Sequence, residues 1–182
     1  MKKKEPKSNI NDRLYTLKAT IIAGSVADKF VEDNPVVSRT IEIRGSQTLK
    51  TLHYAIYDSV EFDDEHLYAF EIGGKKPNSK TAERFALQPP VGGMGGWGSA
   101  MFGESKRERG VTQTKISSLG LKPKQKFFYE FDFGDEWWWE IVVMSIGDEV
   151  PKGRYPRVTE RVGENPPQYV DLEGEEEDEF ED

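Results

Sequence analysis

Alternation of apolar and polar residues divides the first half of the chain into short, regular elements. Residues 14–23 alternate in the way that is typical of a strand with one buried face, and 36–44 predict a second strand. Residues 66–72 are apolar-rich and end at two glycines, so we expect a third strand there. Between the last two strands an amphipathic helix is predicted, because apolar residues recur at intervals of three and four: Leu49, Leu52, Ile56 and Val60.

The second half contains a predicted hairpin between two less regular stretches. Residues 127–133 and 137–146 are rich in aromatic and β-branched side chains, and Gly134-Asp135-Glu136 between them suits a tight turn. Residues 75–114 show little pattern beyond one helical turn near 81–87, and 151–169 are expected to be irregular. We therefore predict an α+β fold, with a mostly antiparallel sheet of about five strands, one main helix packed across it and the order β-β-α-β-β-β. A ubiquitin-like roll is one arrangement of these elements.

The length and local composition predict one domain with flexible ends. A chain of 182 residues fits a single core, which we place in residues 14–170, after a flexible basic N-terminus over 1–13. A Gly-rich stretch near 88–112 has a high entropic cost of ordering, so a mobile loop or lid is expected there. Residues 171–182 contain nine carboxylates and no lysine or arginine, which predicts a disordered acidic tail.

The charge distribution changes what the net charge implies about partners. The chain carries a net charge of −8, but without the tail the remainder carries about +1. A nearly neutral body lacks the basic surface that contacts with nucleic-acid phosphates need. Net charge therefore does not support nucleic-acid binding, although a local basic patch is compatible with it.

Composition also limits the cofactors, metals and compartments to be considered. The sequence has no cysteine, which excludes disulfides and thiolate metal sites. The Gly-rich stretch lacks the Gly-x-x-x-x-Gly-Lys order of a phosphate-binding loop, so we expect no cofactor. No run approaches the roughly 18 to 20 apolar residues that span a bilayer. We therefore expect a soluble cytoplasmic protein without membrane contact.

Two kinds of polar side chain are candidates for chemistry. Asp132 and Asp135 flank Gly134, and such carboxylates bind hard cations or act as acid and base. The alternative is turn chemistry, which already accounts for aspartate beside glycine and which we favour. His53 and His66 are the only histidines, and imidazole serves as a base, ligand or donor. Because a metal site needs more ligands than these, we expect no metal and favour a structural role.

Trp137 and Trp139 are candidates for binding by stacking. They lie on one side of the predicted strand and Trp138 on the other. An exposed indole ring stacks on a base, a sugar or a partner protein. Burial of both faces under loops is an equally favoured interpretation.

Three segments resemble a known family. They are Thr48-Leu-Lys-Thr-Leu-His-Tyr-Ala-Ile, Asp64-Glu-His-Leu-Tyr-Ala-Phe-Glu-Ile and, most specifically, Tyr129-Glu-Phe-Asp-Phe-Gly-Asp-Glu-Trp-Trp-Trp-Glu-Ile. Together they resemble the plasmid pRiA4b ORF-3-like family, and Tyr155-Pro-Arg and Pro166-Pro are similar to its closing segment. The resemblance covers roughly Tyr15 to Tyr169. It supports the fold and implies an association with plasmids or mobile elements, but it implies no particular activity.

The chain departs from the family pattern at three positions. Relatives usually carry histidine two residues after the first hairpin tryptophan, a second histidine after His-Leu, and cysteine before Pro-Pro. This chain has Trp139, Tyr68 and Asn165 there. Metal-binding or catalytic roles that depend on those histidines and that cysteine are therefore not implied here.

These observations leave three function hypotheses. We favour a non-catalytic binding or interaction module for an unknown protein or small ligand, because no complete catalytic constellation is present. The first alternative is a hydrolase-like enzyme that uses the carboxylate and histidine cluster beneath the Gly-rich loop. The second is a nucleic-acid-binding accessory protein of a mobile element, whose binding would weaken steeply with salt.

Overall fold

The computed structural model describes residues 12–63, 65–87 and 109–169. The expectations about a flexible N-terminus, an acidic tail and most of the Gly-rich stretch fall outside these residues.

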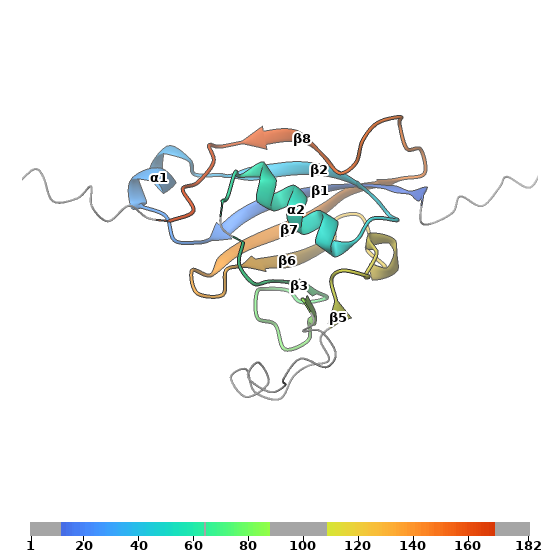
Figure 1. The fold of residues 1–182 in the computed structure, drawn as a ribbon, viewed down its shortest axis with the longest axis horizontal. Coiled ribbons are helices and arrows are strands. Elements are labelled where there is room, and N and C mark those ends of the chain that lie inside the picture. The colour runs from blue at the N-terminus through green and yellow to red at the C-terminus, as the bar shows by residue number, and fades with distance from the viewer. Residues whose placement is uncertain (1–11, 64, 88–108, 170–182) are drawn as a thin grey trace, which may run out of the picture.

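The described chain forms one sheet, in the strand order β5-β4-β3-β6-β7-β1-β2-β8 (Figure 1). Neighbouring strands are antiparallel throughout, except that the two-residue strand β5 joins β4 in parallel. The strands are β1 (Leu14–Ala23), β2 (Ser38–Arg44), β3 (Tyr68–Ile72), β4 (Glu83–Ala86), β5 (Arg109–Gly110), β6 (Lys126–Phe131), β7 (Trp137–Gly147) and β8 (Arg157–Val162).

Helix α2 (Leu49–Ser59) lies across one face of this sheet (Figure 1). Thr48 caps its first turn by accepting a hydrogen bond from the Thr51 amide at 3.3 Å, which satisfies one of the helix's free N–H groups. The other helical segments are short: α1 (Asp28–Asp33), which buries no residue, and the 3-10 turn η2 (Ile116–Leu119). Among the described residues, only α2 therefore contributes a helical layer.

The predicted fold class was wrong. The sheet contains seven strands joined in antiparallel fashion plus the short β5, rather than about five strands, and the described chain is mainly β. Residues 81–87 contain β4 instead of a helical turn, and 151–169 contain β8 instead of an irregular segment. β4 has only four residues, and β8 is an edge strand whose side chains are mostly exposed. Neither strand has the apolar alternation that burial of one face produces, so the pattern did not reveal them.

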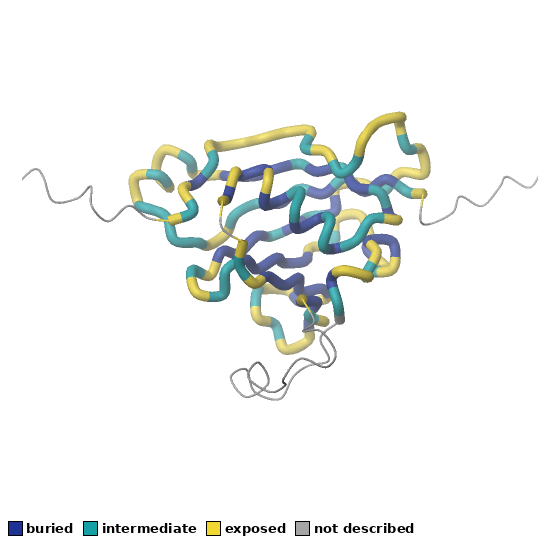
Figure 2. The backbone as a smooth tube through the Cα atoms, viewed as in Figure 1, coloured by how far each residue is buried: buried dark blue, intermediate teal, exposed yellow. Residues whose placement is uncertain are grey.

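The core lies between α2 and the sheet, where the central strands are buried and β8 is exposed (Figure 2). The elements predicted from alternation lie within two residues of their expected bounds. Leu52 and Ile56 of the helix pack in one cluster with Phe127 and Ile141 of the sheet. Burial of these apolar side chains stabilises the fold at about 25 cal/mol per Å² of apolar area removed from water.

The opposite face of the sheet carries a buried ion-pair network. Arg84 of β4 donates to Glu71 of β3 at 3.1 Å and to Glu130 of β6 at 2.8 Å. Burial raises the pKa of Glu130, while its hydrogen bond to Arg84 acts in the other direction. Phe133 covers the guanidinium at 5.0 Å. The network joins three strands on a face that α2 does not cover.

We predict that Gly24→Ala destabilises the protein by about 1 to 3 kcal/mol, because overpacking a core forces strain on its neighbours. A Cβ atom at Gly24 would overlap the indole ring of Trp137, which is fully buried. The matched control is Gly147→Ala, whose Cβ would have its nearest neighbour at 3.9 Å. Urea unfolding followed by tryptophan fluorescence measures both, and equal losses in the two variants would contradict the prediction.

Candidate functional site

His53 belongs to α2, and its side chain is buried in the core between the helix and the sheet. Its Nδ1 is 2.7 Å from the Tyr129 hydroxyl, and its ring stacks on Tyr68 with centroids 3.6 Å apart. Burial lowers the pKa of His53 to about 3, and Lys50 adds to this effect. His53 is therefore neutral near pH 7 and has little affinity for a proton, which is unsuited to general-base catalysis.

Two buried phenols surround this histidine. Burial raises the pKa of both Tyr68 and Tyr129. The Tyr68 hydroxyl is buried without a hydrogen-bond partner in the described part of the chain. Because the Tyr68 ring stacks on that of His53, an imidazole and a phenol share this place in the core.

His66 lies at a different place, beside the turn between β6 and β7. Its Nε2 is 3.5 Å from Asp132 Oδ2 and 2.9 Å from the Tyr169 hydroxyl. Both histidine rings contact Phe131, with centroid distances of 6.2 Å for His53 and 5.8 Å for His66. The structure thus brings His66 near Asp132 but leaves His53 apart from that pair.

Asp132 builds the turn. Its φ angle is +52°, and its Oδ1 accepts from the amides of Gly134 at 3.0 Å and Asp135 at 3.4 Å. An aspartate tolerates this left-handed conformation because its side chain bonds the local backbone. Asp135 contributes its amide to the same arrangement. The local geometry is that of a turn held by one carboxylate.

Trp137 and Trp139 lie in the core. Their exposed fractions are 0% and 1%, and Trp137 packs edge-on against Phe62 at 5.0 Å. Trp138 on the other face is 5% exposed. Both faces of the strand are therefore covered, and none of the three rings is open for stacking.

The predicted residues do not form a metal centre. Within the described ranges, no three His, Asp or Glu side chains are arranged to hold a metal ion.

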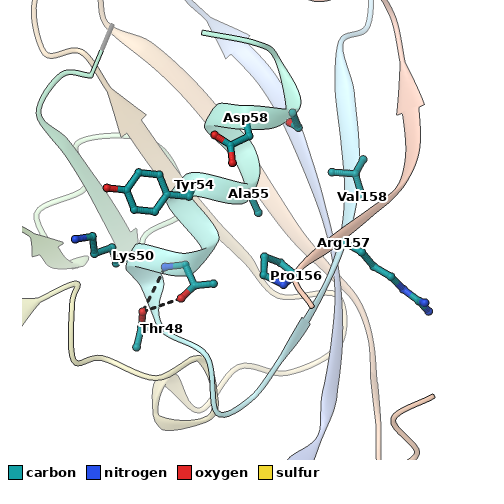
Figure 3. A pocket seen from close by; sticks show the side chains of 10 residues that line it. Thr48, Lys50, Tyr54, Ala55, Asp58, Pro156, Arg157 and Val158 are labelled. Carbon is teal, nitrogen blue, oxygen red and sulfur yellow. Dashed lines mark hydrogen bonds between the residues drawn. The ribbon is translucent and has the colours of Figure 1, made fainter. Parts of the chain in front are cut away.

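A groove of about 600 Å³ lies instead between α2 and the beginning of β8 (Figure 3). It contains none of the residues predicted from the sequence as site candidates. Its lining residues are Thr48, Lys50, Thr51, Tyr54, Ala55, Asp58, Ser59, Pro156, Arg157 and Val158.

The helical periodicity explains the helix side of the groove. Thr51, Ala55 and Ser59 recur every four residues and form one row along α2. Lys50, Tyr54 and Asp58 form the adjacent row with the same spacing. Neither row belongs to the apolar stripe that packs on the sheet, although Ala55 is partly buried against the core. The two rows leave a polar helix surface with one small apolar residue near its middle.

The other side of the groove comes from the start of β8. Pro156 and Val158 point toward α2, whereas Arg157 points away (Figure 3). Arg157 is held there by Glu42 of β2 at 2.6 Å. A hydrogen bond of 2.7 Å from Gln47 Nε2 to the Tyr155 carbonyl ties this segment to the start of α2.

Arg39 of β2 connects the far ends of α2 and β8. It is 1% exposed and donates to the carbonyls of Ser59 at 3.1 Å and Val162 at 2.9 Å. A further bond of 2.6 Å reaches Asn165 Oδ1. Burial lowers the pKa of Arg39, and nearby Arg161 acts in the same direction. The sequence offered no pattern that would identify this arginine as buried.

Two opposite charges of the groove have no ionic partner. Lys50 lies over the Tyr54 ring at 5.7 Å. Within residues 12–63, 65–87 and 109–169 neither Lys50 nor Asp58 forms an ion pair. Both charges are therefore available to a bound partner.

We predict that the stabilising effect of His53 depends on pH. The unfolded chain binds a proton at this residue below pH 6.5, and the folded chain does so only below about pH 3. The contribution is complete above pH 6.5 and falls by about 1.4 kcal/mol per pH unit as the pH is lowered through that window. The free energy of unfolding of wild type minus that of His53→Phe should fall accordingly. A difference that does not change between about pH 7 and about pH 4 would contradict the assignment.

We also predict that Asp132→Ala costs about 1 to 3 kcal/mol, because alanine removes the turn bonds and is strained at a positive φ angle. Asp132→Asn keeps an acceptor and tolerates this backbone, so it should cost less than half as much. Asp135→Ala is the matched control and should be nearly neutral. Chemical denaturation ranks the three, and an equal loss for Asp132→Ala and Asp135→Ala would refute the turn role.

No helix in the described residues is long and apolar enough to cross a membrane. No curated protein matches the chain. A solved structure with a similar fold is a protein of unknown function, MM3350, from Methanosarcina mazei Go1. The two share 20% sequence identity with a TM-score of 0.58, over 82% of this chain and 69% of the other. At this identity the similarity concerns the fold alone.

The family resemblance is confirmed by a match over most of the sequence. The model described as plasmid pRiA4b ORF-3-like protein matches residues 29–178, which include α2, the β6–β7 hairpin and β8. The chain therefore belongs to the plasmid pRiA4b ORF-3-like family.

Proposed function

We propose that this protein is a non-catalytic binding module whose recognition surface is the groove between α2 and β8. The observation that carries the proposal is the groove itself. It combines about 600 Å³ of space and an apolar middle with two charges that have no ionic partner among the described residues. Ligand sites in proteins are commonly concave surfaces of about 300 to 1,000 Å³ with a few polar groups. The groove has this character.

The hydrolase-like alternative has less support. It needs the histidines and aspartates in one cavity, within hydrogen-bond reach of a substrate. His53 is buried and bonded to Tyr129, while Asp132 is engaged in its own turn. The groove contains neither residue.

The polarity of the groove favours a protein segment over nucleic acid. Asp58 at one end would repel phosphates, whereas Lys50 at the other end would attract them. Opposite charges separated by an apolar surface match the mixed composition of a polypeptide more closely than that of a polyanion. The association with plasmids or mobile elements remains a prediction from the resemblance.

We predict that phage-displayed random peptides selected on the full chain lose binding to Ala55→Arg. A large charged side chain at position 55 would fill the middle of the groove, so at least about a tenfold loss of affinity is expected. Val31→Arg is the matched control, because Val31 is 49% exposed on α1, which does not line the groove. Peptides should retain their affinity for that variant.

The folding of each variant is checked by its melting temperature. Thr51→Arg provides a second obstruction in the same helix row if Ala55→Arg does not fold. Selected peptides that bind wild type and both groove variants equally would disprove the groove as the recognition surface. A selection that yields no specific peptide would count against a peptide-binding module.

A further inference from the structure

We infer that the occupant of the groove is an extended protein segment in which one apolar side chain is flanked, two residues away on each side, by one acidic and one basic side chain. This inference rests on the proposed function and adds the chemistry of the partner.

The two free charges of the groove fix the distance between the partner's charges. Lys50 and Asp58 lie eight residues apart on one face of α2, which corresponds to about 12 Å along the helix axis. Lys50 is near the first turn of the helix, and Asp58 is near its last turn. A partner that pairs with both must present an acidic and a basic group at about the same separation.

An extended chain provides this separation on a single face. Successive side chains of a strand point to opposite sides, so residues i, i+2 and i+4 face the same way. With a rise of 3.2 to 3.4 Å per residue, i and i+4 are separated by about 13 Å. The spacing of the two charges in an extended partner therefore equals the spacing of Lys50 and Asp58 when the partner's charged residues are at positions i and i+4.

The middle of the groove accepts the apolar side chain at i+2. Along the helix axis Ala55 lies between Lys50 and Asp58, in the neighbouring row. Pro156, just before β8, and Val158 of β8 point toward the helix (Figure 3). Tyr54 adds an aromatic ring on the adjacent row. An aliphatic side chain placed there would remove apolar surface of both partners from water, which favours binding.

The elements that form the groove are held at both ends. Gln47 bonds the Tyr155 carbonyl at one end, and Arg39 bonds Ser59 and Val162 at the other. The spacing between the helix and the strand is therefore preformed. Preorganisation lowers the entropic cost of binding and makes the charge spacing a condition that the partner must meet.

Three capped peptides of one composition test the inference on the full chain. The first is Thr-Lys-Thr-Val-Thr-Glu-Thr and the second is its reverse, Thr-Glu-Thr-Val-Thr-Lys-Thr. The third, Thr-Thr-Thr-Val-Lys-Glu-Thr, has its charges adjacent. One of the first two should bind about two- to fivefold more tightly than the third, because only these can pair with both ends of the groove. Titrations monitored by amide chemical shifts give the affinities.

A charge-exchanged protein provides the decisive comparison. The double variant Lys50→Glu with Asp58→Lys should prefer whichever of the first two peptides the wild type binds less well. This variant is expected to fold, because an acidic residue near the helix N-terminus and a basic one near its C-terminus interact favourably with the helix dipole. An unchanged preference in the variant, or equal affinity of the wild type for all three peptides, would overturn the inference.

The outcome also separates this inference from the proposed function. The three peptides could fail to bind while library-selected peptides still bind and lose their affinity for Ala55→Arg. That result would overturn the extended charge pattern and leave the proposed binding module intact. Selected peptides whose charges repeat every seven or eight residues would indicate a helical partner and overturn it as well. Absence of any selected peptide would remove the proposed function itself.

Discussion

The separation of α2 from β8 depends on a buried cation that has carbonyl and amide oxygens as its partners. Arg39 is 1% exposed, and it bonds the last residue of α2, the last residue of β8 and the side chain of Asn165. Burying a guanidinium is costly unless its donors are satisfied, so these acceptors are constrained to lie around it. The C-terminal end of a helix also attracts a positive charge through its free carbonyls. Arg39 thus couples helix, edge strand and closing segment, and the groove is the space that this coupling leaves between them.

The aromatic core performs a different task. His53, Tyr68 and Tyr129 are polar side chains inside an otherwise apolar layer, and the neutral imidazole bonds one phenol while stacking on the other. A polar contact of this kind permits one orientation of α2 on the sheet, whereas aliphatic packing would permit several. In this chain the location is committed to packing, and its low proton affinity makes it unsuited to acid–base chemistry.

The sequence predicted the elements that leave a strong local pattern. β1 and α2 were found because each buries one face. The strands of the β6–β7 hairpin were found from their aromatic and β-branched residues on either side of a turn. All of them lie within two residues of their expected bounds. β4 and β8 escaped because a short or exposed strand has no such period, and the number of strands was therefore wrong. Aspartate beside glycine pointed to Asp135 as the turn residue, but the side-chain bonds of the turn come from Asp132, two residues before the glycine. The groove was not predictable from the sequence. Its helix residues have the pattern of an ordinary solvent-exposed helix face, and β8, which forms the other side of the groove, was not predicted.

The position of the groove follows from having one helical layer on a wide sheet. A single helix of eleven residues covers only part of a sheet of this width. The polar side of the helix therefore lies next to β8, the edge strand on that side of the sheet. At this boundary the sheet has an exposed edge strand, and two charges of the helix have no ionic partner in the part of the chain that the structure describes. Both elements can therefore form further interactions with a partner. The residues that would be needed for catalysis are bonded to one another or to the backbone, whereas Lys50 and Asp58 have no ionic partner in the described chain. A binding role at this boundary therefore requires no rearrangement of the core, only a partner whose charges match the helix.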